Sequence, residues 1–192
     1  MPAKPGERKL QILQTLAHML EEPKPEKITT ASLAAKLGVS EAALYRHFSG
    51  KAQMFEGLIE FIEQTLFGLI NRITAEEKDG ARQLEKITSL LLGFARQNRG
   101  MTRVLIGDAL VNEDPRLQAR INQLHDRLEA TLRQCLRFAA GEAAAAADED
   151  SAARANLVMS FVAGRWHQYA KSGFKREPLE HWEGQWAVLM PR

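Results

Sequence analysis

Cysteine is nearly absent from this sequence, since Cys135 is the only one among 192 residues. A single thiol excludes an intramolecular disulfide, and its place in an apolar helical pattern predicts a small buried side chain. Long apolar runs are also missing. None approaches the roughly 20 residues that span a bilayer, and no apolar segment follows Met1 as in a secretory signal. We therefore expect a cytoplasmic protein without a membrane span.

The common motifs of catalysis are missing as well. The sequence has no Gly-x-Ser-x-Gly stretch and no glycine-rich phosphate loop. Its five histidines do not follow the spacing of metal ligands. We therefore predict no enzymatic activity, no catalytic residue, no metal and no cofactor. Trp166, Trp182 and Trp186 suit either core packing or a ligand cavity, and core packing is the favoured interpretation.

Strand patterns are the third absence, because period-two alternation is not found and helical periodicity fills the chain. The pattern predicts an all-α fold with a helix-turn-helix DNA-binding domain at 7–52 and a helical dimerisation and partner-binding domain at 53–192. Residues 1–6 are expected to form a tail, Pro23 and Pro25 to end the first helix, and residues 139–153 to form a loop. The expected helices cover 7–21, 30–37, 41–47, 51–75, 80–97, 100–111, 116–139, 152–171 and 178–189.

The formal net charge of +2 is too small to imply nucleic-acid binding. Its distribution is more informative, because residues 1–51 carry eight Lys or Arg against five acids. This excess of three positive charges weakly indicates a basic N-terminal face.

Residues 29–51 read as one complete recognition unit. Thr29 or Thr30 suits the N-cap of a first helix, Gly38 suits the positive φ of a tight turn, and Ser40 suits the N-cap of a second, recognition helix. Leu33, Leu37, Leu44 and Phe48 are then expected to face a small core. The alternative is a pair of packed helices without a role in DNA binding.

The outward residues of this unit suit two kinds of DNA contact. Small apolar groups at the start of the recognition helix permit close approach to bases, whereas hydroxyl and basic groups suit phosphates. An acid at position 41 is unexpected beside DNA, although it suits a helix N-terminus. The predicted DNA-binding residues are Thr29, Thr30, Ser40, Ala42, Ala43, Tyr45, Arg46, His47 and Lys51.

Residues 116–139 form the most periodic stretch, with an alternating spacing of four and three like a coiled-coil seam. Together with the 152–171 helix, this seam predicts a four-helix interface in a homodimer. The alternative is that both stripes serve only the core of one chain. The predicted interface residues are Leu117, Ile121, Leu124, Leu128, Phe161 and Trp166.

The stretch Thr30–Phe48, with its Tyr45-Arg46-His47-Phe48 run and the following Lys51–Phe55, resembles the N-terminal domain of the TetR family. The segments Leu58–Glu63, Leu90–Phe94 and Arg120–Leu124 extend the resemblance to a branch of this family, the nucleoid occlusion factors. The resemblance implies an all-helical homodimer without a small-molecule cofactor. It also implies binding to palindromic double-stranded DNA across the nucleoid and to the division GTPase FtsZ, whose ring assembly is inhibited there.

The same resemblance assigns the FtsZ-facing surface to the 51–75 helix and the next one. A helical wheel agrees for Phe61, which lies on the flank of the apolar stripe. Leu69 and Gln97 depart from the family pattern, which has arginine there. The implied FtsZ-binding residues are Phe61, Leu90, Gly93 and Asn98.

Two other hypotheses compete with a DNA-activated division inhibitor. One is a ligand-responsive transcriptional repressor of the TetR family, and the other is a helical enzyme or scaffold. Matches outside the DNA-binding unit favour the division inhibitor, because a generic repressor would not share them.

Overall fold

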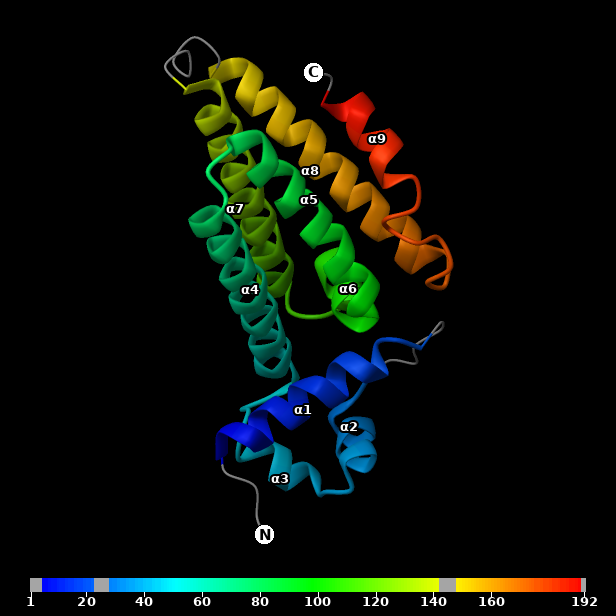
Figure 1. Cartoon of the computed structure of the whole chain (residues 1–192). Coiled ribbons are helices and arrows are strands. Elements are labelled where there is room, and N and C mark those ends of the chain that lie inside the picture. The colour runs from blue at the N-terminus through cyan, green and yellow to red at the C-terminus, as the bar shows by residue number, and fades with distance from the viewer. Residues whose placement is uncertain (1–4, 23–27, 142–147, 191–192) are drawn as a thin grey trace. The chain divides into compact units, whose positions relative to one another are not determined.

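Helices make up all the regular structure in the residues that the computed structural model describes, which are 5–22, 28–141 and 148–190. This result confirms the predicted all-α fold (Figure 1). Residues 1–4 of the predicted tail at 1–6, the stop at Pro23 and Pro25, and residues 142–147 of the predicted loop at 139–153 lie outside these ranges. The described parts of that tail and loop are mostly helical, because α1 begins at Pro5, α7 extends to Ala140 and α8 begins at Asp148. The helices are α1 (Pro5–Met19), α2 (Thr30–Leu37), α3 (Glu41–Tyr45), α4 (Lys51–Glu76), α5 (Gly80–Gln97), α6 (Arg99–Leu105), η1 (Asp108–Leu110), α7 (Pro115–Ala140), α8 (Asp148–Lys171) and α9 (Trp182–Leu189).

Three predicted helix boundaries are wrong by four or more residues. The helix expected over 100–111 ends at Leu105, because Gly107 takes a left-handed φ of 76° and a separate 3-10 turn follows. Helix α8 begins at Asp148 instead of 152, since acidic residues favour the first turn of a helix. The last helix begins at Trp182 instead of 178, because His181 has a φ of 62° that no α-helix accepts.

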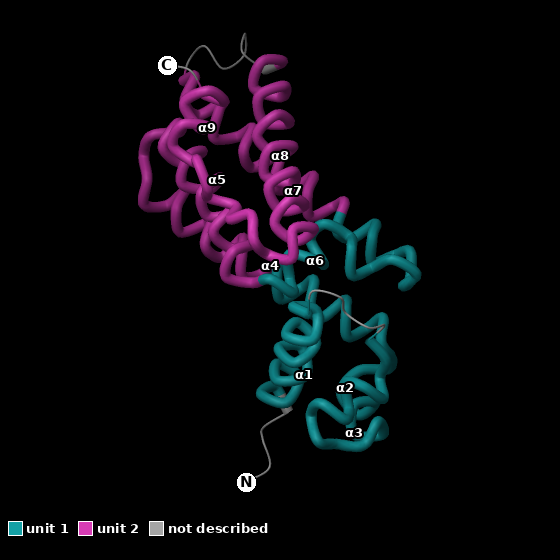
Figure 2. The backbone as a smooth tube through the Cα atoms, turned by 90° about the vertical axis from the view of Figure 1, so that its right-hand side faces the viewer, with its two compact units in different colours: residues 1–62, 99–121 teal, residues 63–98, 122–192 magenta. Residues whose placement is uncertain are grey.

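The chain divides into two compact units (Figure 2). The first comprises residues 1–62 and 99–121, so it contains α1–α3, the start of α4, α6 and η1. Helix α6 packs closely on α1: a Cβ at Gly100 would lie 1.8 Å from the carbonyl oxygen of Ala17. Arg103, 6% exposed, donates to Asp108 at 2.8 Å and to the carbonyl oxygen of Glu22 at 3.1 Å. These contacts hold α6 to α1. The sequence division at 7–52 and 53–192 stays a prediction.

The second unit comprises residues 63–98 and 122–192. Its helices α5, α7 and α8 lie side by side, with α9 beside α8 (Figure 1). Trp166 and Tyr169 join α8 to α5, because the indole Nε1 donates to the carbonyl oxygen of Leu91 at 2.9 Å and the phenol to that of Arg96 at 3.3 Å. Both rings are fully buried. Core packing of Trp166 is therefore confirmed.

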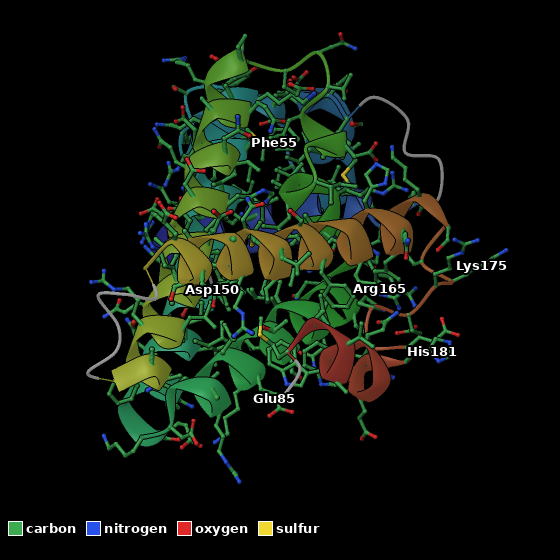
Figure 3. All side chains as sticks on the ribbon, turned by 90° about the horizontal axis from the view of Figure 1, so that it is seen from above. Phe55, Glu85, Asp150, Arg165, Lys175 and His181 are labelled. Carbon is green, nitrogen blue, oxygen red and sulfur yellow. The ribbon has the colours of Figure 1, made fainter. Side chains whose placement is uncertain are left out.

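Arg165 helps to hold the connection between α8 and α9. The guanidinium of Arg165 lies beside this connection in Figure 3 and donates to the carbonyl oxygens of Glu177, Pro178 and Glu180 at 2.6–3.2 Å. Carbonyls that end a helix or turn need such donors when they are partly buried. The arginine thus fixes the chain that leads into α9.

Within the described ranges, no helix combines the length and apolar character that crossing a membrane requires.

The structure corrects the predicted dimer interface. Leu117, Ile121, Leu124, Leu128 and Trp166 are 0–1% exposed in the single chain. Side chains without exposed surface in one chain have none to bury against a second, so these five serve the core. Phe161 is half-buried and stays a candidate.

Candidate nucleic-acid interface

Residues 29–48 form two short helices joined by a tight turn. The hydroxyl of Thr29 accepts from the backbone N–H of Ser32 at 3.0 Å, while the Ser32 hydroxyl accepts from the N–H of Thr29 at 3.0 Å. This reciprocal cap starts α2 and satisfies amides that no helical carbonyl reaches. At the other end Gly38 has φ 66° and ψ 36°, and its N–H donates to the carbonyl of Ala35. The left-handed glycine reverses the chain into α3.

The inner faces of the two helices form a small core. Leu33, Ala34, Leu44 and Phe48 are 1–6% exposed, as the sequence predicted for the leucines and the phenylalanine. Leu37 is only half-buried, since it lies at the last turn of α2 beside Gly38. The small side chain of Ala34 lets the helices cross closely, which fixes the angle between α2 and α3.

The predicted DNA-binding residues lie outside this core. None of them is buried, and Tyr45 is 48% exposed. The Tyr45 hydroxyl donates to Thr30 Oγ1 at 3.4 Å, which links the end of α3 to the start of α2. Hydroxyls and a basic side chain on one edge suit the oxygens of a nucleic-acid backbone. The exposed members are Thr29, Ser40, Ala42, Tyr45 and Arg46, and the half-buried ones are Thr30, Ala43, His47 and Lys51.

The recognition helix itself presents few polar groups. Ser40 caps α3 by accepting from the N–H of Ala43 at 3.3 Å, and Ala42 is exposed beside it. The polar group that begins α3 is Glu41, whose Oε2 accepts from the Thr30 hydroxyl at 2.6 Å. The sequence indicated that an acid here suits a helix N-terminus, but not that it bonds Thr30. Its position as the first residue of the recognition helix is the sequence signal that marks it as a candidate for contact with DNA.

Lys51 is held by an acid that is distant in sequence. Its ammonium forms an ion pair with Glu113 and lies 5.7 Å from the centre of the Phe55 ring. The two charged side chains are only 21% and 14% exposed. Sequence reasoning missed this pair because 62 residues separate its members. A phosphate that binds Lys51 must therefore share it with Glu113 or replace that carboxylate.

The residues implied for a protein partner are all half-buried, and they divide between the two units. Phe61 belongs to the first unit, and Leu90, Gly93 and Asn98 belong to the second. Leu90 and Gly93, three residues apart, lie on one side of α5, and Asn98 caps its end. A Cβ at Gly93 would meet only Leu179, at 4.0 Å. Helix α5 is continuous through Gly93, as the predicted helix over 80–97 requires.

Two family models together match most of the chain. Residues 12–58 match the model "Bacterial regulatory proteins, tetR family". Residues 78–192 match the SlmA-like model described as "Tetracyclin repressor-like, C-terminal domain". The first match contains the whole helix-turn-helix unit, and the second begins just before α5.

Curated relatives match over nearly the full length. The nucleoid occlusion factor SlmA of Alteromonas mediterranea is 52% identical over 190 residues, which cover 98% of this chain and 97% of the relative. That of Marinomonas sp. is 49% identical, covering 98% and 96%. This chain belongs to the SlmA family of nucleoid occlusion factors. As an SlmA-family member it carries a TetR-type DNA-binding domain, which confirms the resemblance on which the sequence interpretation depends.

Solved structures agree with the fold of this SlmA-family chain. The transcriptional regulator FadR of Bacillus subtilis, in complex with stearoyl-CoA, superposes with a TM-score of 0.71 at 13% identity, and the match covers 95% of this chain and 97% of that one. The TetR-family regulator PfmR of Thermus thermophilus gives 0.67 at 20% identity, with coverage of 95% and 96%. At these identities the likeness concerns the fold alone. The names of the relatives are those of occlusion factors and regulators, not of enzymes.

Proposed function

We propose that this chain binds palindromic DNA sites as a cytoplasmic, nucleoid-associated homodimer and, when bound, binds FtsZ and inhibits assembly of the division ring. The observation that supports the DNA part is the pair of helices α2 and α3 around the left-handed Gly38 turn, with none of the predicted contacts buried. The near full-length similarity to nucleoid occlusion factors supports the division part.

Several of the predicted DNA contacts have a geometry that suits their proposed role. The hydroxyls of Thr29, Thr30 and Tyr45 and the charge of Arg46 lie at the outward edge, where they suit phosphates. Ala42 and Ala43 let the helix approach the bases and can touch a thymine methyl. Their small size leaves part of the recognition to DNA shape.

For the dimer, the observations favour the outer faces of α8 and α9 instead of the predicted seam. Leu157 is 51% exposed and Val188 81% exposed. The Phe161 ring lies 6.4 Å from that of Trp182, itself 5.0 Å from the ring of Trp186, and all three are half-buried. An apolar surface of this kind on a monomer fits an interface better than solvent. A second copy of this chain is its proposed occupant, because a palindrome presents two equivalent half-sites.

For FtsZ, the proposed contacts are Phe61 in the first unit and the side of α5 that carries Leu90 and Gly93, with Asn98 at its end. A glycine without a close neighbour lets a partner's backbone approach the helix. Phe61→Ala is expected to weaken FtsZ binding and to spare DNA binding. Equal loss of both activities would identify Phe61 as a packing residue instead.

The decisive experiment is co-sedimentation of FtsZ polymers with the full-length chain, with and without its palindromic DNA. DNA should increase the effect on FtsZ polymers, and scrambled DNA of equal length is the control. If specific DNA never changes that effect, the proposed division inhibition fails.

A ligand-responsive repressor is the second candidate, and one observation favours it. The second unit contains an open cavity of about 780 Å³ whose lining includes Leu84, Leu136, Trp186 and Arg154. Genome-wide mapping of binding sites separates the two functions. Scattered palindromes support nucleoid occlusion, whereas a single site at a neighbouring promoter supports the repressor.

A further inference from the structure

The acid that begins the recognition helix is the feature that phosphate binding does not explain. Glu41 is exposed at the first position of α3, on the same edge as Tyr45 and Arg46. A carboxylate on a surface that meets a polyanion opposes binding by like-charge repulsion. It also adds little as a cap, because Ser40 already accepts the N–H of Ala43. Its presence there calls for a contact that only a hydrogen-bond acceptor can make.

The structure holds this carboxylate in one orientation. The Thr30 hydroxyl donates to Oε2 at 2.6 Å, and Thr30 in turn accepts from the Tyr45 hydroxyl at 3.4 Å. Three side chains from the starts of α2 and α3 and the end of α3 thus form one chain of hydrogen bonds. Among the described residues this bond to Oε2 is the one hydrogen bond that the carboxylate accepts, so Oε1 keeps its lone pairs for an incoming donor.

The chemistry of the major groove limits what that donor can be. Cytosine presents its N4 amine there, whereas guanine and thymine present acceptor oxygens that repel a carboxylate. Adenine presents an amine, but its N7 acceptor lies beside it. The neighbouring Ala42 and Ala43 offer only methyl groups. The residues at the start of a recognition helix are those that reach base edges.

We propose that Glu41 determines sequence specificity by accepting a hydrogen bond from the N4 amine of a cytosine in each half-site. Thr30 is a positioning residue that fixes the carboxylate through Oε2 and leaves Oε1 toward the base. This inference rests on the proposed DNA binding. It adds a base-reading role to an edge whose other members contact phosphates or methyl groups.

The test is selection of random duplexes with the full-length protein, followed by fluorescence anisotropy on single-base variants of the selected site. Wild type should require cytosine at one position of each half-site and lose about tenfold or more in affinity with any other base there. Glu41→Ala should reduce that ratio to within about twofold and keep the preferences elsewhere. Glu41→Gln should shift the preference to adenine, because an amide both donates and accepts.

Two controls separate base reading from charge and from folding. Glu85→Ala removes one exposed acid from α5 and should leave every base preference unchanged. Thr30→Val keeps the shape of the side chain without the hydroxyl and should weaken the cytosine preference with Glu41 still present. Circular dichroism checks that each variant is folded. The Glu41 variants should be folded, because Glu41 is exposed and outside the core.

The outcomes distinguish this inference from the function on which it depends. If wild type selects a palindrome and Glu41→Ala keeps the same cytosine preference, the inference is overturned and DNA binding stands. If wild type selects no sequence at all, both fail. A uniform rise in affinity for all duplexes with Glu41→Ala would show that the acid only repels phosphates, which also overturns base reading.

Discussion

At the scale of single residues, Lys51 shows how a predicted DNA contact is constrained by its partner. The ion pair with Glu113 is mostly shielded from solvent, so its ammonium is already oriented and partly neutralised. A partly buried pair of this kind interacts more strongly than an exposed one, because water screens it less. Glu113 therefore competes with any phosphate for Lys51.

The first prediction tests this competition by changing each partner. Lys51→Ala should weaken DNA binding and reduce the slope of log affinity against log salt by about one, the loss of one phosphate contact. Glu113→Gln should strengthen DNA binding, since it frees the ammonium. Anisotropy titrations at several salt concentrations measure both effects. If Glu113→Gln weakens binding as much as Lys51→Ala does, Lys51 acts only by holding the fold.

Cys135 gives the second prediction at this scale. Burial raises the pKa of its thiol from its usual value near 9 to about 11. The folded state therefore keeps the neutral thiol, whereas the unfolded chain ionises it first. Its contribution to stability is complete below pH 9 and is lost as the pH rises toward 11.

Thermal unfolding of wild type and Cys135→Ala across this window measures the effect. Wild type should lose more stability than the variant between pH 9 and 11, because only wild type has the thiol. Parallel pH profiles for the two proteins would contradict the raised pKa. A thiol reagent should label the native protein at neutral pH only as fast as the fold opens.

At the scale of elements, glycines decide where helices approach each other. Gly100 lets α6 lie directly on α1, since a Cβ would overlap the carbonyl oxygen of Ala17. Gly93 on α5 has no such neighbour. Glycine is therefore required for close helix packing at position 100, whereas at position 93 a Cβ would fit beside the helix.

The third prediction compares these two positions. Gly100→Ala should lower the free energy of unfolding by about 1–3 kcal/mol, the usual cost of overpacking a close contact. Gly93→Ala should raise it by about 0.5–1 kcal/mol, because alanine favours a helix interior. Urea unfolding measures both values. Comparable effects of the two substitutions would mean that α6 does not cross α1 closely.

At the scale of the whole molecule, assembly depends on which apolar surface one chain leaves uncovered. The seam residues Leu117, Ile121, Leu124 and Leu128 of α7 are already covered within the chain. Phe138 near the end of α7, Leu157 on α8 and Val188 on α9 are exposed. The position of exposed apolar area, not the regularity of a heptad, thus selects the proposed interface.

The fourth prediction concerns this interface. Leu157→Glu should convert the dimer to a monomer in light scattering, because it places a charge at the centre of an apolar contact. Affinity for the palindrome should then fall at least about tenfold, since a monomer binds one half-site. Val111→Glu, an equally large change at a 66% exposed residue of the first unit, should leave the dimer intact. A dimeric Leu157→Glu protein would require another interface.

Features that local chemistry controls could be predicted from the sequence. The cap at Ser40, the left-handed Gly38 and the 3.6-residue period of the long helices are local signals that the structure confirms, and it selects Thr29 from the two predicted caps, Thr29 and Thr30. Tertiary structure alone decided what covers each apolar stripe and which charges pair across 62 residues, as for Lys51 and Glu113. The physical reason is that periodicity shows that a helix has an apolar face, whereas only packing shows which surface buries it.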